Sequence, residues 1–95
     1  MIYSVEDDVP AAWDNIITSF ITCTEYVIEH NRVPEVYNIK ISVKRGLLDI
    51  NFCGGDKLVD GFAIFAREMS STICSSCGAP STRIVFGFPK CDECQ

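Results

Sequence analysis

Two pairs of cysteines near the end of the chain have the spacing of a metal site. Cys74 and Cys77 form one Cys-x-x-Cys pair, Cys91 and Cys94 form a second, and thirteen residues separate the pairs. Two thiolates three positions apart can bind one ion from a tight turn, and zinc prefers four such ligands in a tetrahedron. The spacing therefore predicts one structural Zn²⁺. With four protein ligands the site would have no open position for water or substrate, which argues against metal catalysis.

The segment between the pairs has the pattern of a short β-hairpin, which would bring the second pair back to the first. Gly78 follows Cys77, where such a turn often needs a positive φ. Residues 82–86 are predicted as a strand, Gly87 as the bend and 88–90 as the return, which is the layout of a zinc ribbon. Two disulfides or a redox-active Cys-x-x-Cys are the alternatives. Disulfides need an oxidising compartment, and the redox motif usually follows a strand of a βαβ unit, a pattern absent from this sequence.

Two amphipathic helices are predicted before the ribbon. In residues 10–31 apolar side chains recur every three or four positions, and Asp7 or Asp8 is the candidate N-cap. The same period appears in residues 56–72, where Asp56 is the candidate N-cap. Each helix would therefore bury one face.

A β-hairpin is predicted between the helices. Apolar and polar residues alternate in two runs on either side of Arg45-Gly46, which indicates two strands with one buried face. A turn of two or four residues places every large apolar side chain on that face. The pairs would be Val43 with Leu48, Ile41 with Ile50, and Ile39 with Phe52.

These elements predict one small α+β domain. Residues 1–73 (the body) would form an α-β-β-α unit with both helices on one face of the hairpin, and residues 74–95 (the ribbon) would pack on it within one folding unit. A chain of 95 residues buries only a modest share of its surface. A structural metal can therefore stabilise it as much as the hydrophobic core does.

The charge is unevenly distributed along the chain. The formal net charge is −5, but residues 1–35 carry −6 and the remainder +1. A negative protein has the wrong sign for general nucleic-acid affinity and favours basic partners. Asp14, Glu25 and Glu29 lie off the apolar stripe of the first helix, so we expect either a solvated face or a docking surface for a basic partner.

The remaining candidates for chemistry have structural explanations. His30 sits in the last turn of the first helix, where it can interact with free carbonyl groups, and spacing ties no carboxylate or nucleophile to it. Cys23 and Cys53 lack a neighbouring ligand at metal spacing, so we expect them to pack as small apolar residues. The acidic start and the lack of a long apolar run predict a cytoplasmic protein without a signal peptide or membrane span.

The order of motifs resembles a group of small bacterial and phage-borne proteins with no established activity. The likeness is carried by Val43–Phe52, by Ala66–Ser70 in the second helix, and by Thr72–Pro80 at the first cysteine pair. It covers about residues 40–94 and departs from the group's pattern at Ser81, at the single glycine of the hairpin turn, and at Cys94, where a histidine is common. The resemblance implies a zinc ribbon on a hairpin-and-helix body. Its setting in mobile elements favours a counter-defence or immunity protein.

Three classes of function remain open from the sequence. The first is a non-enzymatic, zinc-stabilised protein-binding module, such as a small acidic inhibitor or adaptor. The second is a nucleic-acid-binding regulator, in which Phe86 and Phe88 would stack on bases beside basic residues, namely Lys40, Lys44, Arg45, Arg67, Arg83 and Lys90. The third is an enzyme, which lacks an evident acid–base pair or activated nucleophile. An unpaired strand edge would also permit a homodimer.

Overall fold

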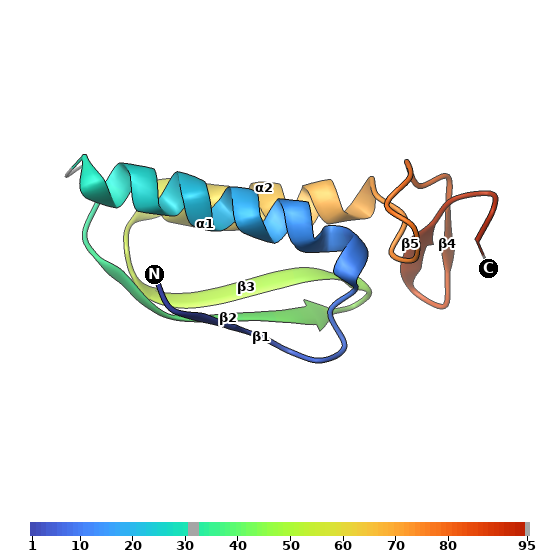
Figure 1. Cartoon of the computed structure of the whole chain (residues 1–95), viewed down its shortest axis with the longest axis horizontal. Helices are drawn as coiled ribbons and strands as arrows, with labels where there is room; N and C mark the ends of the chain where they lie inside the picture. The colour runs from blue at the N-terminus through green and yellow to red at the C-terminus, as the bar shows by residue number, and fades with distance from the viewer. Residues whose placement is uncertain (31–32, 95) are drawn as a thin grey trace.

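The body consists of a three-stranded sheet covered on one face by two helices. The computed structural model describes residues 1–30 and 33–94. The elements of the body are β1 (Tyr3–Val5), the 3₁₀ turn η1 (Ala11–Trp13), α1 (Asp14–Glu29), β2 (Val36–Lys44), β3 (Leu47–Gly54) and α2 (Lys57–Ser71). Figure 1 shows α1 and α2 side by side above the sheet, as predicted for both helices. Among the described residues, neither helix is long and apolar enough to cross a bilayer.

The sheet has one strand more than the predicted hairpin. β1 pairs in parallel with β2, with Tyr3 opposite Ile39, and the strand order is β1-β2-β3. The α-β-β-α order is therefore corrected to β-α-β-β-α, and the α+β class is confirmed. The three residues of β1 are all exposed. They show no alternation of buried and exposed positions, which is the pattern from which strands are predicted.

The predicted hairpin register is confirmed next to the Arg45-Gly46 turn and is interrupted farther from it. Val43 lies opposite Leu48 and Ile41 opposite Ile50, as the alternation predicts. The register shifts between Tyr37 and Lys40, so the predicted partner of Phe52 is replaced by a bulge. Asn38 sits in this bulge with φ 53°, a conformation that asparagine tolerates better than most residues.

The start of the first helix differs from the prediction. Residue 10 is extended rather than helical, the chain then makes the 3₁₀ turn, and α1 begins only at Asp14 without a side-chain cap. Asp7 and Asp8 are therefore not the N-cap, and the predicted end at residue 31 lies outside the described residues. The N-cap of α2 is confirmed, since Asp56 Oδ1 accepts a hydrogen bond from the Leu58 N–H at 2.9 Å.

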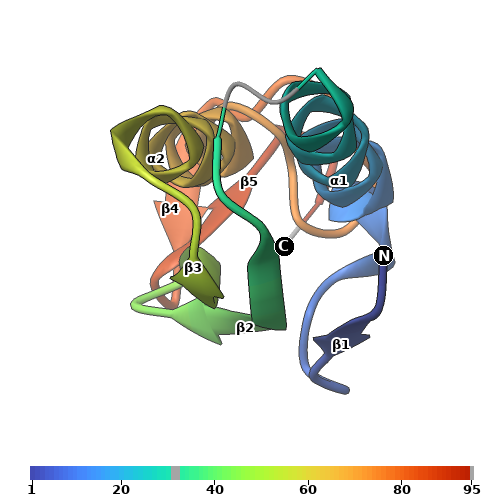
Figure 2. The ribbon, with the colours of Figure 1, turned by 90° about the vertical axis from the view of Figure 1, so that its left-hand side faces the viewer.

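The core lies between the helices and the sheet. Its most enclosed apolar side chains come from the 3₁₀ turn, from β2 and β3, and from α2, namely Trp13, Ile41, Leu48 and Val59. The Phe20 and Phe52 rings, 6.4 Å apart, extend this contact between α1 and β3. The end-on view in Figure 2 shows that the two helices cover one face of the sheet.

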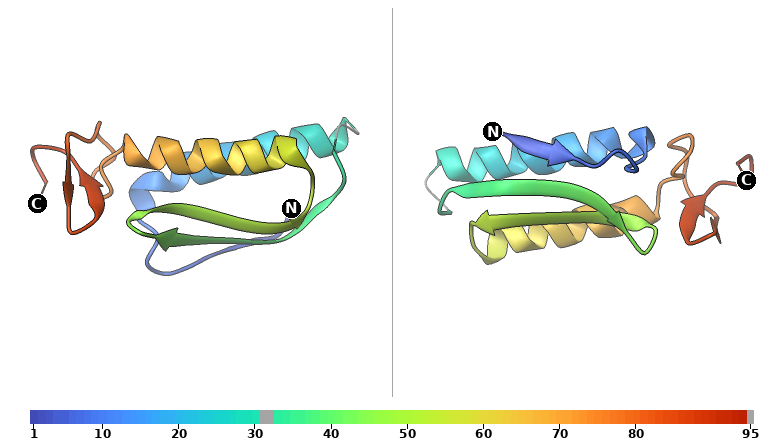
Figure 3. Two further views of the ribbon diagram at one scale, coloured as in Figure 1. Left: turned by 180° about the vertical axis from the view of Figure 1, so that it is seen from behind. Right: turned by 90° about the horizontal axis from the view of Figure 1, so that it is seen from below.

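The ribbon continues the long axis of the body. It contains β4 (Arg83–Val85) and β5 (Phe88–Lys90), which form a separate two-stranded antiparallel sheet. Figure 3 shows this unit beyond the C-terminal end of α2. The Trp13 indole N–H donates to the Ile73 carbonyl at 3.3 Å, and the Ser81 N–H and hydroxyl donate to the Thr72 and Ser71 carbonyls. The free carbonyls at the end of α2 are thus bonded from both sides of the junction.

Two hairpin turns touch where the body meets the ribbon. Arg45-Gly46 joins β2 to β3 and Phe86-Gly87 joins β4 to β5, and all four residues have positive φ, as in type I′ turns. A Cβ added to Gly46 would lie 1.7 Å from the Gly87 carbonyl oxygen. Gly46 therefore permits the close approach of the two turns.

Candidate metal centre

The first cysteine pair lies in a tight turn directly after α2. The Gly78 N–H donates to the Cys74 carbonyl at 3.0 Å, and Gly78 has φ 81°. The glycine expected after the second cysteine is thus in the left-handed conformation that the turn requires. Within the turn, the Ser76 N–H points at Cys74 Sγ at 3.4 Å. A backbone donor aimed at sulfur stabilises a thiolate.

The second cysteine pair is brought to the first by the ribbon hairpin. The Cys94 N–H donates to the Cys91 carbonyl at 3.3 Å, which closes the turn of this second pair. The Ser75 N–H donates to the Pro89 carbonyl at 2.9 Å, which joins the first turn to β5. Pro89 lacks an N–H and occupies an edge position, as expected for proline in a strand.

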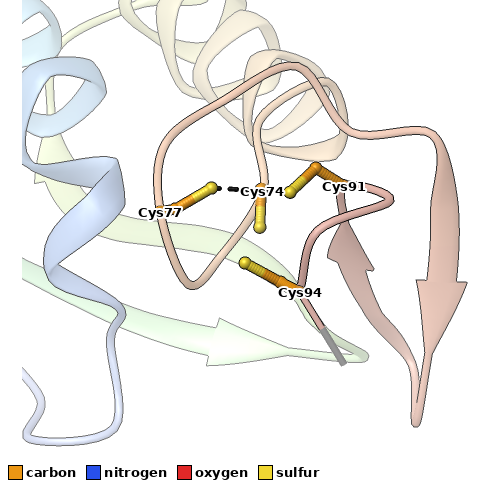
Figure 4. Close-up of side chains that lie close together, drawn as sticks. All are labelled: Cys74, Cys77, Cys91 and Cys94. Atoms are coloured by element: carbon orange, nitrogen blue, oxygen red, sulfur yellow. Dashed lines mark hydrogen bonds between the residues drawn. The ribbon is translucent and has the colours of Figure 1, made fainter.

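All four predicted ligands point toward a common centre (Figure 4). Their sulfur atoms lie within 4.8 Å of one another, and Cys77 Sγ and Cys91 Sγ are 3.5 Å apart. In a tetrahedron with metal–sulfur bonds of about 2.3 Å, sulfur atoms are about 3.8 Å apart. The residues therefore fit a four-coordinate metal ion without rearrangement of the backbone. Cys74 and Cys91 are buried, whereas Cys77 is exposed.

Backbone donors and neighbouring thiols set the acidity of Cys74 and Cys94. Burial raises the pKa of Cys74, but the backbone N–H groups of Ser76, Cys77 and Cys91 outweigh it and lower that pKa to about 6. The thiols of Cys91, Cys77 and Cys74 raise the pKa of Cys94 to about 12. Negative charge on the first sulfur thus opposes charge on the last one, and a cation at the centre would relieve this opposition.

Two basic side chains of the ribbon are engaged within it. Arg83 donates from Nε to the Cys91 carbonyl at 3.4 Å and from Nη2 to the Cys94 carbonyl. Lys90 Nζ donates to Ser76 Oγ in the first turn. Both cations lie beside the cluster of thiols, where they offset its negative charge.

The two remaining cysteines are not part of the centre. Cys23 lies on α1 and Cys53 near the end of β3, and both side chains are exposed. The expectation that they pack as core residues is therefore wrong. Cys53 shares the outward parity of Asp49 and Asn51 along β3, and Cys23 borders a shallow apolar groove between the two helices.

The three acidic residues predicted to bind a partner are not all together. Glu25 and Glu29 lie at the C-terminal end of α1, whereas Asp14 is its first residue. Asp14 and Glu25 are eleven positions apart in α1, a distance of about 16 Å along the helix. Their role in binding stays a prediction, and it has to be tested separately for Asp14 and for the pair Glu25 and Glu29.

Glu25 and Glu29 border a cleft that the sequence did not predict. The cleft has a volume of about 860 Å³ and lies between the end of α1 and strands β1 and β2. Tyr3 and Tyr37 supply partly exposed aromatic walls, and Glu35 adds a third carboxylate. The Met1 amino group lies 3.2 Å from Glu25 Oε2, so this carboxylate accepts an ammonium within the cleft.

His30 is held at the helix end. Its Nδ1 lies 2.8 Å from the Tyr26 carbonyl oxygen, and its ring stacks on that of Tyr26 with centroids 4.1 Å apart. The interaction with a terminal carbonyl agrees with the structural explanation given by the sequence. Both rings are part of the outer surface of α1, away from the core.

Comparisons with protein-family models, with curated proteins and with solved structures found no match to this chain.

Proposed function

We propose that this chain is a non-enzymatic protein-binding module whose ribbon is stabilised by one structural Zn²⁺. Four cysteine sulfurs at tetrahedral spacing are the donor set that zinc prefers over the harder cations, and they fill its coordination sphere. A closed site supplies folding energy rather than catalysis. The Nδ1 of His30 is bonded to the Tyr26 carbonyl, which gives the single histidine of the chain a structural role at the end of α1.

The observation that carries the binding proposal is the cleft at the end of α1. It combines carboxylates from Glu25, Glu29 and Glu35 with the exposed faces of Tyr3 and Tyr37. Carboxylates attract a lysine or arginine side chain, and an aromatic face adds a cation–π contribution of about 0.5–1 kcal/mol at exposed sites. The partner that fits best is a protein that inserts a basic side chain or segment. An acidic inhibitor or adaptor, as in counter-defence or immunity systems, acts in this way.

The proposal is tested by charge reversal in the cleft. Tagged protein would capture partners from lysate of the source cells, treated with nuclease and kept with reducing agent and zinc. We expect one near-stoichiometric protein with the unaltered chain and at least a tenfold loss with Glu25→Lys/Glu29→Lys, because two attractive charges become repulsive. Asp14→Lys, on the same helix, is the matched variant: normal capture restricts the surface to the cleft, and reduced capture extends it along α1.

Two results would contradict this proposal. Capture that is unchanged by the double reversal would show that the acidic cleft is a solvated surface. Recovery of nucleic acid alone, in a sample without nuclease, would favour the alternative function as a zinc-ribbon nucleic-acid-binding regulator.

The regulator alternative is favoured by one observation. Phe86 at the tip of the ribbon is 98% exposed, and the turn that carries it touches the turn of Arg45. An exposed aromatic ring near a cation is a feature of single-strand binding surfaces. Phe88, however, packs against the core, and Arg83 is bonded to the cysteine turns. These residues are therefore engaged elsewhere, which weakens the predicted stacking surface.

A further inference from the structure

The outer edge of β3 carries backbone groups without partners. The β2–β3 register closes on a two-residue turn, so odd-numbered residues of β3 exchange hydrogen bonds with β2. The even-numbered residues Leu48, Ile50 and Phe52 therefore turn their N–H and C=O groups outward. The hydrogen bond of Leu48 is consistent with this alternation, because its N–H points away from β2 and donates to Ser70 Oγ on α2 at 3.1 Å. In the described part of the chain, Ile50 and Phe52 have no such partner on this edge.

A groove lies along this edge beneath α2. Its volume is about 360 Å³, and the residues that matter here are Ile50, Phe52, Asp60, Ala63, Ile64 and Arg67. Figure 2 and the right-hand view of Figure 3 show the first turns of α2 outside the line of β3. A helix is about 10 Å across and neighbouring strands are about 4.8 Å apart. The helix layer therefore covers the place that one more strand beside β3 would take.

The same overhang excludes a second copy of this chain as the occupant. A two-fold axis perpendicular to the sheet at this edge would pair β3 antiparallel with β3 at about 4.8 Å, with both helix layers on the same face. It would also bring both copies of α2 over the same place, whereas packed helix axes need about 8–10 Å. An extended segment without a covering helix of its own has no such conflict.

The charges beside the groove link the direction of that segment to its sequence. The chain passes from the end of β3 directly into α2, and the Leu48 N–H bonds to Ser70 near the other end of the helix, so α2 runs antiparallel to β3. Of the residues that line the groove, Asp60 is therefore at the Phe52 end and Arg67 at the Leu48 end. Ile64, half-way between them on the same face of α2, is 53% exposed. Asp60 and Arg67 are about 10 Å apart along the helix, and five residues of a strand span about 14 Å. A strand antiparallel to β3 would thus place a basic residue, an apolar residue and an acidic residue at alternate positions, in that order.

We propose that the groove between β3 and α2 binds an extended segment of a partner polypeptide as a fourth strand of the sheet. Backbone hydrogen bonds to Ile50 and Phe52 hold the segment, Ile64 contacts its central apolar residue, and Asp60 and Arg67 fix its direction. This mode of recognition is β-strand addition, in which the backbone supplies affinity and alternate side chains supply specificity. The surface is separate from the acidic cleft and does not depend on it.

The test uses two synthetic peptides of identical composition, acetyl-TKTVTET-amide and acetyl-TETVTKT-amide, with the zinc-loaded, ¹⁵N-labelled protein. For a strand antiparallel to β3 we expect the first peptide to bind about three- to tenfold more tightly, because two rim charge pairs are then favourable only in that order; tighter binding of the second peptide would contradict the antiparallel direction. The largest amide shifts and the strongest slowing of hydrogen exchange should occur at Ile50 and Phe52. The variant Asp60→Lys/Arg67→Glu should reverse the preference between the peptides.

Other outcomes would overturn the proposal. Absence of amide shifts with either peptide at millimolar concentration would mean that the edge does not accept a strand. Shifts centred on the acidic cleft would assign peptide binding to that site instead. Protection of Ile50 and Phe52 that rises with protein concentration, without peptide, would mean that a second copy fills the edge.

Discussion

Leu48 in the body is fully buried, whereas Phe86 at the tip of the ribbon is 98% exposed. The contrast extends to the whole of both parts. The body encloses an apolar cluster between its helices and its sheet. Within the described residues 74–94 of the ribbon, the buried side chains are two cysteines and a proline, namely Cys74, Cys91 and Pro89. Burial of apolar surface therefore stabilises the body. The ribbon depends on its cysteine centre and on hydrogen bonds between its turns.

Removal of the metal should give the largest difference between the two parts, because it should disorder the ribbon and leave the body folded. Metal analysis under reducing conditions should give one zinc per chain. Chelation, or Cys91→Ser, should abolish the dispersed amide signals of the ribbon, because structural zinc contributes on the order of 10 kcal/mol to such sites. The helical circular dichroism of the body should persist. Cys23→Ser, at an exposed cysteine outside the centre, is the control and should change neither quantity.

Two results would contradict the dependence of the ribbon on a metal. Much less than half an equivalent of zinc would remove the metal from the explanation. An ordered ribbon after chelation would show that its hydrogen bonds are sufficient.

Truncation of apolar side chains should destabilise the body more than the ribbon. Leu48→Ala removes a fully buried side chain and should lower the free energy of unfolding by about 2–5 kcal/mol. Ile84→Ala, in the ribbon, truncates a side chain that is 62% exposed and should change it by no more than about 0.5 kcal/mol. Urea unfolding with zinc present measures both. Similar losses from the two variants would mean that the ribbon has an apolar core of its own.

The contact between the two hairpin turns allows a finer test. Gly46→Ala places a methyl group against the Gly87 carbonyl oxygen, and Gly87→Ala meets nothing within 4 Å. Both glycines have positive φ, so both variants share a backbone cost of roughly 1–2 kcal/mol. Gly46→Ala should cost about 1–3 kcal/mol more, because the turns must move apart. Equal effects on thermal unfolding, with unchanged amide shifts at residues 86–88, would show that the contact between the two turns does not stabilise the protein.

The sequence predicted best the features that depend on spacing within one segment. The two Cys-x-x-Cys turns, the helical periods and the alternation around Arg45-Gly46 are local patterns, and the structure places them as expected. The N-cap Asp56 is local for the same reason. The separation of Asp14 from Glu25 also follows from helix geometry alone.

The features that were missed depend on contacts between distant segments. β1 is short and exposed, and it forms only because β2, some 35 residues later, offers an edge. The acidic cleft follows from it, since β1 supplies one of the aromatic walls. Ser70, a polar residue near the end of α2, is fully buried, and its hydroxyl accepts a hydrogen bond from the Leu48 N–H. No pattern within α2 identifies a partner on β3.

Trp13 is the single tryptophan of the chain, and its indole N–H is bonded to the Ile73 carbonyl, one residue before the first cysteine of the metal centre. Its fluorescence therefore originates at the joint between the two parts. A ring that is enclosed and hydrogen-bonded there emits at shorter wavelength than one exposed to water. The colour of the emitted light would thus report whether the ribbon is seated on the body, without any added label.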